Sequence, residues 1–207
     1  MEEIIVSDIQ KDALQEIANI GASHAATVLS QMVNKQIKIM IPRIDIVPLE
    51  RTMDPYKNEE SIVAIFLKIS DEIPSYSLLL MTTKSAFALA DVLLQQKVSS
   101  ERADLTEMEK SALEEVGNIM MCAFFDSIAE MIHIPIVPGP PALAYDMPSA
   151  VMDYILIQIG TIADKIFVFD TAVEEEKEKQ FNISLFLVPE PKSIHIILEK
   201  LGLKENV

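Results

Sequence analysis

Cysteine, glycine and histidine are scarce in this 207-residue sequence, and each shortage excludes a kind of site. The single cysteine, Cys122, rules out an internal disulfide and fits a reducing compartment. Five glycines leave no room for a Gly-rich phosphate loop. The three histidines, His24, His133 and His195, have no cysteine or acidic partners at metal-ligand spacing, so we expect no metal site built by this chain alone.

Basic residues are also few: the sequence has 17 Lys and Arg against 32 Asp and Glu, which gives a net charge of −15. Nucleic acids and anionic membrane surfaces would be repelled. Asp126 and Glu130 interrupt the richest apolar run, so no segment is expected to span a bilayer. The acidic start, MEEIIVSDIQ, does not resemble a leader peptide. We therefore expect a soluble, cytoplasmic protein that binds no nucleic acid and does not insert into membranes.

One segment, residues 11–42, returns as residues 110–141, and half of all residues are hydrophobic, ample for a core. Both copies carry Asp or Ser, then Glu, Asn and Pro at identical spacing. The matched positions are Asp12 and Ser111, Glu16 and Glu115, Asn19 and Asn118, and Pro42 and Pro141. Such matched spacing is hard to obtain by chance, whereas one Glu-x-x-Asn alone would mean nothing.

Helical periodicity divides each copy into an apolar and a polar face. The apolar faces are predicted to hold Leu14, Ile17, Gly21, Ala25, Val28 and Met32, and Leu113, Val116, Met120, Phe124 and Met131. The outward faces are predicted to hold Asp12, Glu16, Asn19, Ser23, Ala26 and Ser30, and Ser111, Glu115, Asn118, Cys122 and Phe125. Met121 is expected to flank the second copy's Asn, where the first copy has small residues.

The Glu and Asn of each copy lie one turn apart, so their tips can touch one common object. Asn is a mediocre helix residue, and no stabilising reason for it is apparent in mid-helix. A single pair would be interpreted as solvated surface, but the duplication favours a functional role. Asp12 and Ser111 either orient the Glu or simply favour the first half of the helix. Pro42 and Pro141 are interpreted as fixing the chain after each helix.

The remaining sequence predicts strands and shorter helices around these two long helices. Strands are expected in 35–50, 61–69 and 75–81, and a hairpin in 164–173 and 180–188 with its tip at 174–179; further helices are expected in 83–96, 146–159 and 191–201. We predict an α+β fold in a single pseudo-twofold-symmetric domain, residues 1–207, made of repeats at about 8–97 and 105–203. A central, mainly antiparallel sheet is expected, with the two motif helices on an outer layer.

The duplicated pattern resembles the CheC/CheX/FliY family of chemotaxis phosphatases, which share a Glu-x-x-Asn helix followed at fixed distance by Pro. Two copies in one chain are similar to the CheC branch. The resemblance implies dephosphorylation of the phospho-aspartate of CheY-P, with Asn19 or Asn118 orienting water and Glu16 or Glu115 contacting the regulator's Lys. It implies no cofactor bound by this chain, and a divalent metal, Mg²⁺, in the partner regulator.

The same resemblance implies binding to the receptor deamidase CheD, for which the helix beginning at Asp146 is the candidate surface. Phe125 is a candidate partner contact, or it packs on a neighbouring helix. Cys122 is a possible nucleophile by position, but no His is placed to activate it, so we expect packing.

Two other functions stay open from the sequence. One is a non-catalytic interaction module resembling the middle domain of the flagellar switch protein FliM, which lacks the Glu and Asn pairs. The other is a self-sufficient hydrolase that uses Glu16 and Glu115 together, which would require the two carboxylates within several ångströms of each other.

Overall fold

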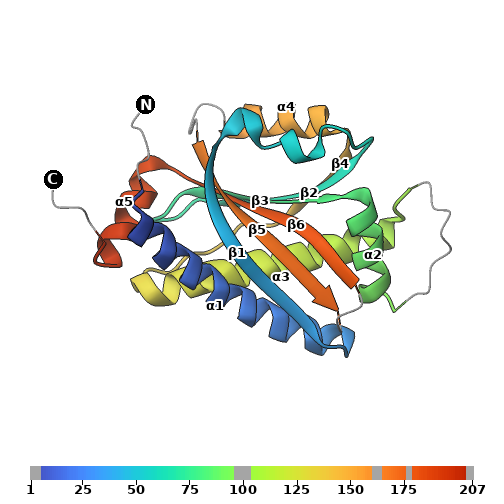
Figure 1. The fold of residues 1–207 in the computed structure, drawn as a ribbon, viewed down its shortest axis with the longest axis horizontal. Helices are drawn as coiled ribbons and strands as arrows, with labels where there is room; N and C mark the ends of the chain where they lie inside the picture. The colour runs from blue at the N-terminus through green and yellow to red at the C-terminus, as the bar shows by residue number, and fades with distance from the viewer. Residues whose placement is uncertain (1–5, 96–103, 160–164, 176–178, 204–207) are drawn as a thin grey trace.

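Both long helices predicted from the duplicated segment are present in the computed structural model, which describes residues 6–95, 104–159, 165–175 and 179–203 (Figure 1). α1 spans Asp8–Val33 and α3 spans Glu107–Ile132, and each has 26 residues. A capping box starts each helix, Ser7 with Gln10 and Thr106 with Glu109. Part of the predicted tip at 174–179 and most of the link between the halves lie outside the described residues.

Six antiparallel strands form one sheet in the order β1-β5-β6-β3-β2-β4. The strands are β1 (Ile37–Pro48), β2 (Ile62–Ile69), β3 (Ser75–Thr82), β4 (Ala142–Asp146), β5 (Lys165–Glu175) and β6 (Lys179–Pro189). The first strand of each half pairs with a strand of the other half, since β1 pairs with β5 and β4 pairs with β2. The predicted fold class, helices with a large antiparallel sheet, is confirmed. The division into repeats 8–97 and 105–203 stays a prediction.

The helices cover both faces of the sheet (Figure 1). The pair α1 and α3 covers one face, and α4 (Pro148–Ile159) covers the other together with the 3₁₀ turns η1 (Leu49–Arg51) and η2 (Asp54–Tyr56). The helices α2 (Thr83–Leu93) and α5 (Pro191–Lys200) lie at opposite ends of the sheet. Alternate residues of β2 therefore enter two separate cores, Ile65 on the α1/α3 side and Phe66 on the α4 side.

Several predicted helix faces are wrong at their margins. Phe125 and Met121 are 2% and 0% exposed, although the sequence placed them outward or beside the motif. In contrast, Val28, Met32 and Met131, which were assigned to the core, are between 41% and 49% exposed. Phe125 and Met121 are buried because α3 contacts α1, α2, α5 and the sheet, which together bury a wider arc of α3 than one apolar stripe.

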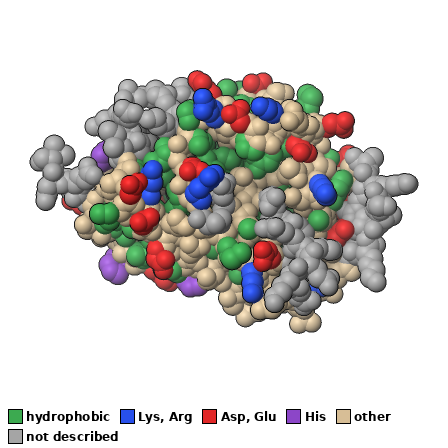
Figure 2. Space-filling model, in the orientation of Figure 1, with side chains coloured by type: hydrophobic (Ala, Val, Ile, Leu, Met, Phe, Trp, Pro, Cys, Tyr) green, Lys and Arg blue, Asp and Glu red, His purple; other side chains and the backbone are tan. Residues whose placement is uncertain are grey.

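The surface follows the acidic composition without a concentrated patch on the face shown in Figure 2. Asp and Glu side chains are scattered over this face, with Lys and Arg side chains between them. No helix among the described residues is long and apolar enough to cross a membrane.

Candidate functional site

The two motif copies lie on neighbouring helices. α1 and α3 run side by side in opposite directions (Figure 1). Their main chains lie close together where Gly21 faces Phe124, a few residues beyond the Asn of each copy. The antiparallel arrangement therefore carries the two Glu and Asn pairs to opposite sides of this crossing.

The carboxylates of both copies are exposed. Glu16 and Glu115 make no hydrogen bond and no ion pair within the part of the chain that the structure describes. Asp12 and Ser111, one turn earlier, are exposed as well. Two carboxylates without internal partners are available to a cation on another molecule.

The carboxamide of Asn19 is occupied by the main chain of β1. Asn19 Nδ2 donates to the Ile41 carbonyl oxygen at 3.3 Å, and the Ile41 N–H donates to Asn19 Oδ1 at 3.1 Å. Gln15 Nε2 donates to the same carbonyl at 3.3 Å. The register of β1 with β5 shifts between Met40 and Arg43, so Ile41 has no ladder partner there. Asn19 thus satisfies a buried peptide group that the sheet leaves unpaired.

The mid-helix Asn of the first copy therefore does have a stabilising reason, contrary to the sequence interpretation. The backbone of Pro42 belongs to β1, next to the residue that Asn19 holds. The sequence reasoning missed Ile41 because this residue is apolar and lies 22 positions beyond Asn19.

The carboxamide of Asn118 is held differently. Cys122 Sγ donates to Asn118 Oδ1 at 3.5 Å, the one hydrogen bond of this side chain within the described residues. In the first copy, Ser23 takes the place of Cys122 and donates to the main-chain oxygen of Asn19 at 2.9 Å. Asn118 is partly buried, and its Nδ2 group donates no hydrogen bond within the described residues.

Prolines remove the second copy's equivalent of the Ile41 contact. Pro140 matches Ile41, and a proline has no N–H to donate. The chain here runs outside the sheet except for an isolated bridge from Pro138 to Ile69, so that β4 begins at Ala142, just after the partly buried Pro141. Asn118 consequently has no strand to hold.

The Cys122 thiol is half-buried beside this second pair. Burial raises its pKa above the ordinary value, and the negative charges of Asp126 and Glu115 raise it further. The group is therefore a neutral thiol at neutral pH, which suits a weak hydrogen-bond donor and does not suit a nucleophile.

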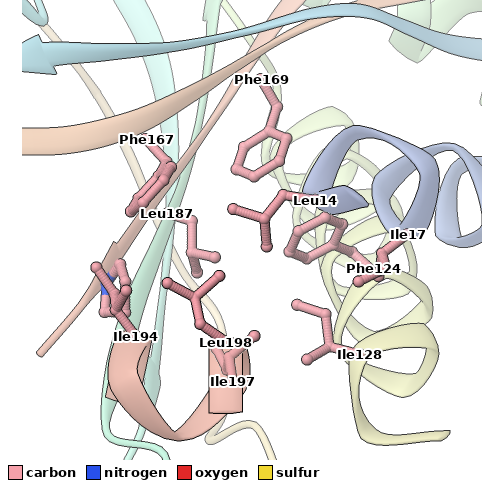
Figure 3. Close-up of a pocket in the computed structure, with 11 residues that line it drawn as sticks. Leu14, Ile17, Phe124, Ile128, Phe167, Phe169, Leu187, Ile194, Ile197 and Leu198 are labelled. Atoms are coloured by element: carbon pink, nitrogen blue, oxygen red, sulfur yellow. The ribbon is translucent and has the colours of Figure 1, made fainter. Parts of the chain in front are cut away.

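The described residues contain no group of three or more His, Cys, Asp or Glu side chains that could hold a metal ion. An apolar cavity of about 20 Å³ lies on the inner side of the first motif, between α1, α3, α5 and the sheet (Figure 3). Leu14 and Ile17 line it, on the two sides of Glu16 in the sequence, yet no polar atom faces it. The cavity offers nothing that a phosphate could bind.

Phe125 and Asp146 complete the predicted site residues. Phe125 packs edge-on against Phe124, with ring centroids 5.6 Å apart, so its prediction as an outward partner contact is wrong. Asp146 is exposed at the end of β4, where its Oδ1 accepts a hydrogen bond from the Met147 N–H at 2.7 Å. Asp146 remains accessible just before α4.

The fold and the paired Glu-x-x-Asn helices resemble those of CheC-like proteins. The model of the CheC-like family matches residues 9–44 and 108–145, which contain the two motif copies. The resemblance predicted from the motif is confirmed. The CheY-P phosphatase CheC of Bacillus subtilis is 24% identical over 204 residues, which cover 95% of this chain and 96% of that protein. The flagellar motor switch phosphatase FliY of the same organism is 27% identical over 136 residues, or 66% of this chain and 35% of FliY.

Solved structures share the fold. FliY of Thermotoga maritima has a TM-score of 0.79 at 20% identity, with 98% of this chain and 100% of that chain covered. The middle domain of FliM from H. pylori has a TM-score of 0.69 at 15% identity, with 94% and 99% covered. At these identities the likeness defines the architecture alone, which FliY and the FliM middle domain share with this chain.

Proposed function

We propose that this chain is a protein phosphatase that hydrolyses the aspartyl phosphate of the response regulator CheY. The observation that carries the proposal is an exposed Glu115 followed one turn later by Asn118, whose carboxamide is not held by the main chain. Its relative CheC in Bacillus subtilis, similar over nearly the full length of both chains, is a CheY-P phosphatase.

In this mechanism the chain completes a site that the regulator largely supplies. The phosphorylated regulator holds its acyl phosphate beside a divalent metal, Mg²⁺, and a Lys. The reaction lacks mainly a water molecule held in line with the phosphorus–oxygen bond that breaks. The carboxamide of Asn118 enters the pocket, and it binds and orients that water. The Glu115 carboxylate binds the regulator's Lys and fixes the docking register through a charge-assisted contact. The chain needs no cofactor of its own for this role.

The test is release of inorganic phosphate from CheY that has been phosphorylated by a small-molecule phosphodonor in the presence of Mg²⁺. We expect the wild-type chain to accelerate release, and Glu115→Gln with Asn118→Ala to reduce the acceleration by about 100-fold. Asp126→Asn, an exposed change two turns further along α3, is the matched control and should keep full activity. A wild-type chain without any effect on phosphate release would refute the proposal.

The alternative is a non-catalytic interaction module, to which the shared FliM architecture would be equally suited. Two exposed, unpaired carboxylates at matched positions favour the phosphatase, because a scaffold does not require them. Binding of phosphorylated CheY without faster phosphate release would support the module.

We further propose that α4 binds the receptor deamidase CheD. The helix exposes Tyr154, Leu156 and Ile157, and the last of these is 76% exposed. An apolar outer face on a helix whose inner face already packs on the sheet favours a protein partner. Ile157→Lys is expected to abolish co-elution with CheD and to keep phosphatase activity, and unchanged co-elution would contradict this surface.

A further inference from the structure

We infer that the two motif copies are unequal: Asn118 is the carboxamide that acts on the phosphorylated regulator, whereas Asn19 mainly fastens β1 to α1. The inference deepens the proposed phosphatase function and rests on it. It follows from three differences between the copies, each at a matched position.

The first two differences remove the main-chain contact from the second copy. Ile41, which supplies both an N–H and a carbonyl to Asn19, is matched by Pro140, which has no N–H. Gln15, which supports the same carbonyl at 3.3 Å, is matched by Glu114, whose carboxylate cannot donate. The second copy therefore cannot repeat this arrangement.

The third difference lies one turn after each Asn. Ser23 donates to the main chain of α1 and leaves the Asn19 side chain to Ile41. Cys122 instead donates its S–H to Asn118 Oδ1 at 3.5 Å. A thiol is a weak donor, so this contact holds the carboxamide only lightly.

These contacts determine which hydrogen bonds each carboxamide must break when it enters a partner's site. Asn19 would give up both hydrogen bonds to Ile41, which is 3% exposed. The main-chain N–H of Ile41 would then be left unsatisfied in the interior. Asn118 would give up one weak hydrogen bond from a half-buried thiol. Releasing Asn19 from Ile41 would therefore consume much of the binding free energy that the regulator supplies, whereas releasing Asn118 would consume very little of it.

The experiment compares matched single variants in the phosphate-release assay with phosphorylated CheY. Glu16→Gln and Glu115→Gln change exposed side chains that have no internal partners, so neither threatens the fold. We expect Glu115→Gln to reduce kcat/KM by about tenfold more than Glu16→Gln does. Asn118→Ala and Asn19→Ala, assayed at a temperature where circular dichroism finds both folded, should rank in the same order.

The outcomes separate this inference from the function on which it rests. A wild-type chain that does not accelerate phosphate release overturns the phosphatase itself. A wild-type chain that is active but loses as much from Glu16→Gln as from Glu115→Gln overturns the inequality and leaves the phosphatase standing. Greater loss in the second copy for both the Glu and the Asn variants supports the inference.

Discussion

A Cβ atom placed on Gly21 would lie 2.7 Å from the Cα atom of Phe124 and 3.1 Å from the carbonyl oxygen of Ala123. The obstacle is main chain, which cannot rotate away as a flexible side chain would. Only a glycine at this position therefore lets α1 and α3 approach so closely. Helical periodicity placed Gly21 on the apolar face, and α3 occupies the space beside it.

Gly21→Ala should accordingly destabilise the protein although alanine is the better helix residue. The gain in helix propensity is about 1 kcal/mol, and overpacking against a main chain costs about 1 to 3 kcal/mol. We therefore expect a net loss of stability, measured as a lower midpoint of urea denaturation. The control is Ser23→Ala, an exposed change two residues along, which should stay within about 0.5 kcal/mol of wild type. An unchanged midpoint for Gly21→Ala would contradict the close packing.

The two motif asparagines should differ in stability as well. Asn19→Ala removes the acceptor for the buried Ile41 N–H and one donor to its carbonyl, so we expect a loss of about 1 to 3 kcal/mol. Asn118→Ala removes a weak thiol contact and gains helix propensity, so its stability should be unchanged or raised by about 0.5 kcal/mol. Chemical denaturation of both variants measures the difference. Equal losses would mean that Asn19 does not fasten β1.

The sequence predicted the elements of the fold well because its patterns are local. Capping residues, prolines and alternating apolar residues located both long helices and five of the six strands to within a few residues, but not β4, which follows a proline-interrupted segment. The burial of individual side chains on α3 could not be predicted in this way. Whether Phe125 faces solvent depends on how many neighbours surround the helix, and those neighbours come from distant parts of the chain.

The spacing of the motif residues located the candidate site, but it did not predict the hydrogen bonds that each side chain makes. Periodicity placed Glu16 and Glu115 outward correctly. The hydrogen bonds of Asn19 depend on an irregularity in the pairing of β1, and no sequence motif predicts that irregularity. One signal was present in the sequence: Ile41 and Pro140 are matched positions, and a proline cannot donate where isoleucine does.

The capping box of α3 predicts a measurable cost for losing Thr106. Its Oγ1 accepts from the Glu109 N–H at 3.3 Å and donates to Glu109 Oε2 at 2.8 Å, and the Glu109 side chain is buried. Thr106→Val keeps the shape and removes both contacts, so we expect a loss of about 1 to 2 kcal/mol. Thermal denaturation beside the exposed control Asp126→Asn checks this value. A variant as stable as wild type would show that the cap contributes nothing.

Cys122 predicts how the second site responds to a thiol reagent. Burial, and then the charges of Asp126 and Glu115, raise the pKa of the thiol above its ordinary value. The thiolate is the reactive form, so a raised pKa leaves less of it at neutral pH than in a free cysteine. Alkylation by iodoacetamide should therefore be slow at pH 7, and its rate should rise by about tenfold per pH unit until the pH passes the raised pKa.

The adduct should then stop catalysis at the second copy. Alkylation replaces the S–H that donates to Asn118 Oδ1 with a bulky group one turn away, where it obstructs the approach of a regulator. We expect phosphatase activity to fall in proportion to the alkylated fraction measured by mass spectrometry. Cys122→Ala is the control, and the reagent should leave its activity unaltered. Rapid alkylation at neutral pH would contradict the raised pKa, and full activity of the alkylated protein would remove Asn118 from the reaction.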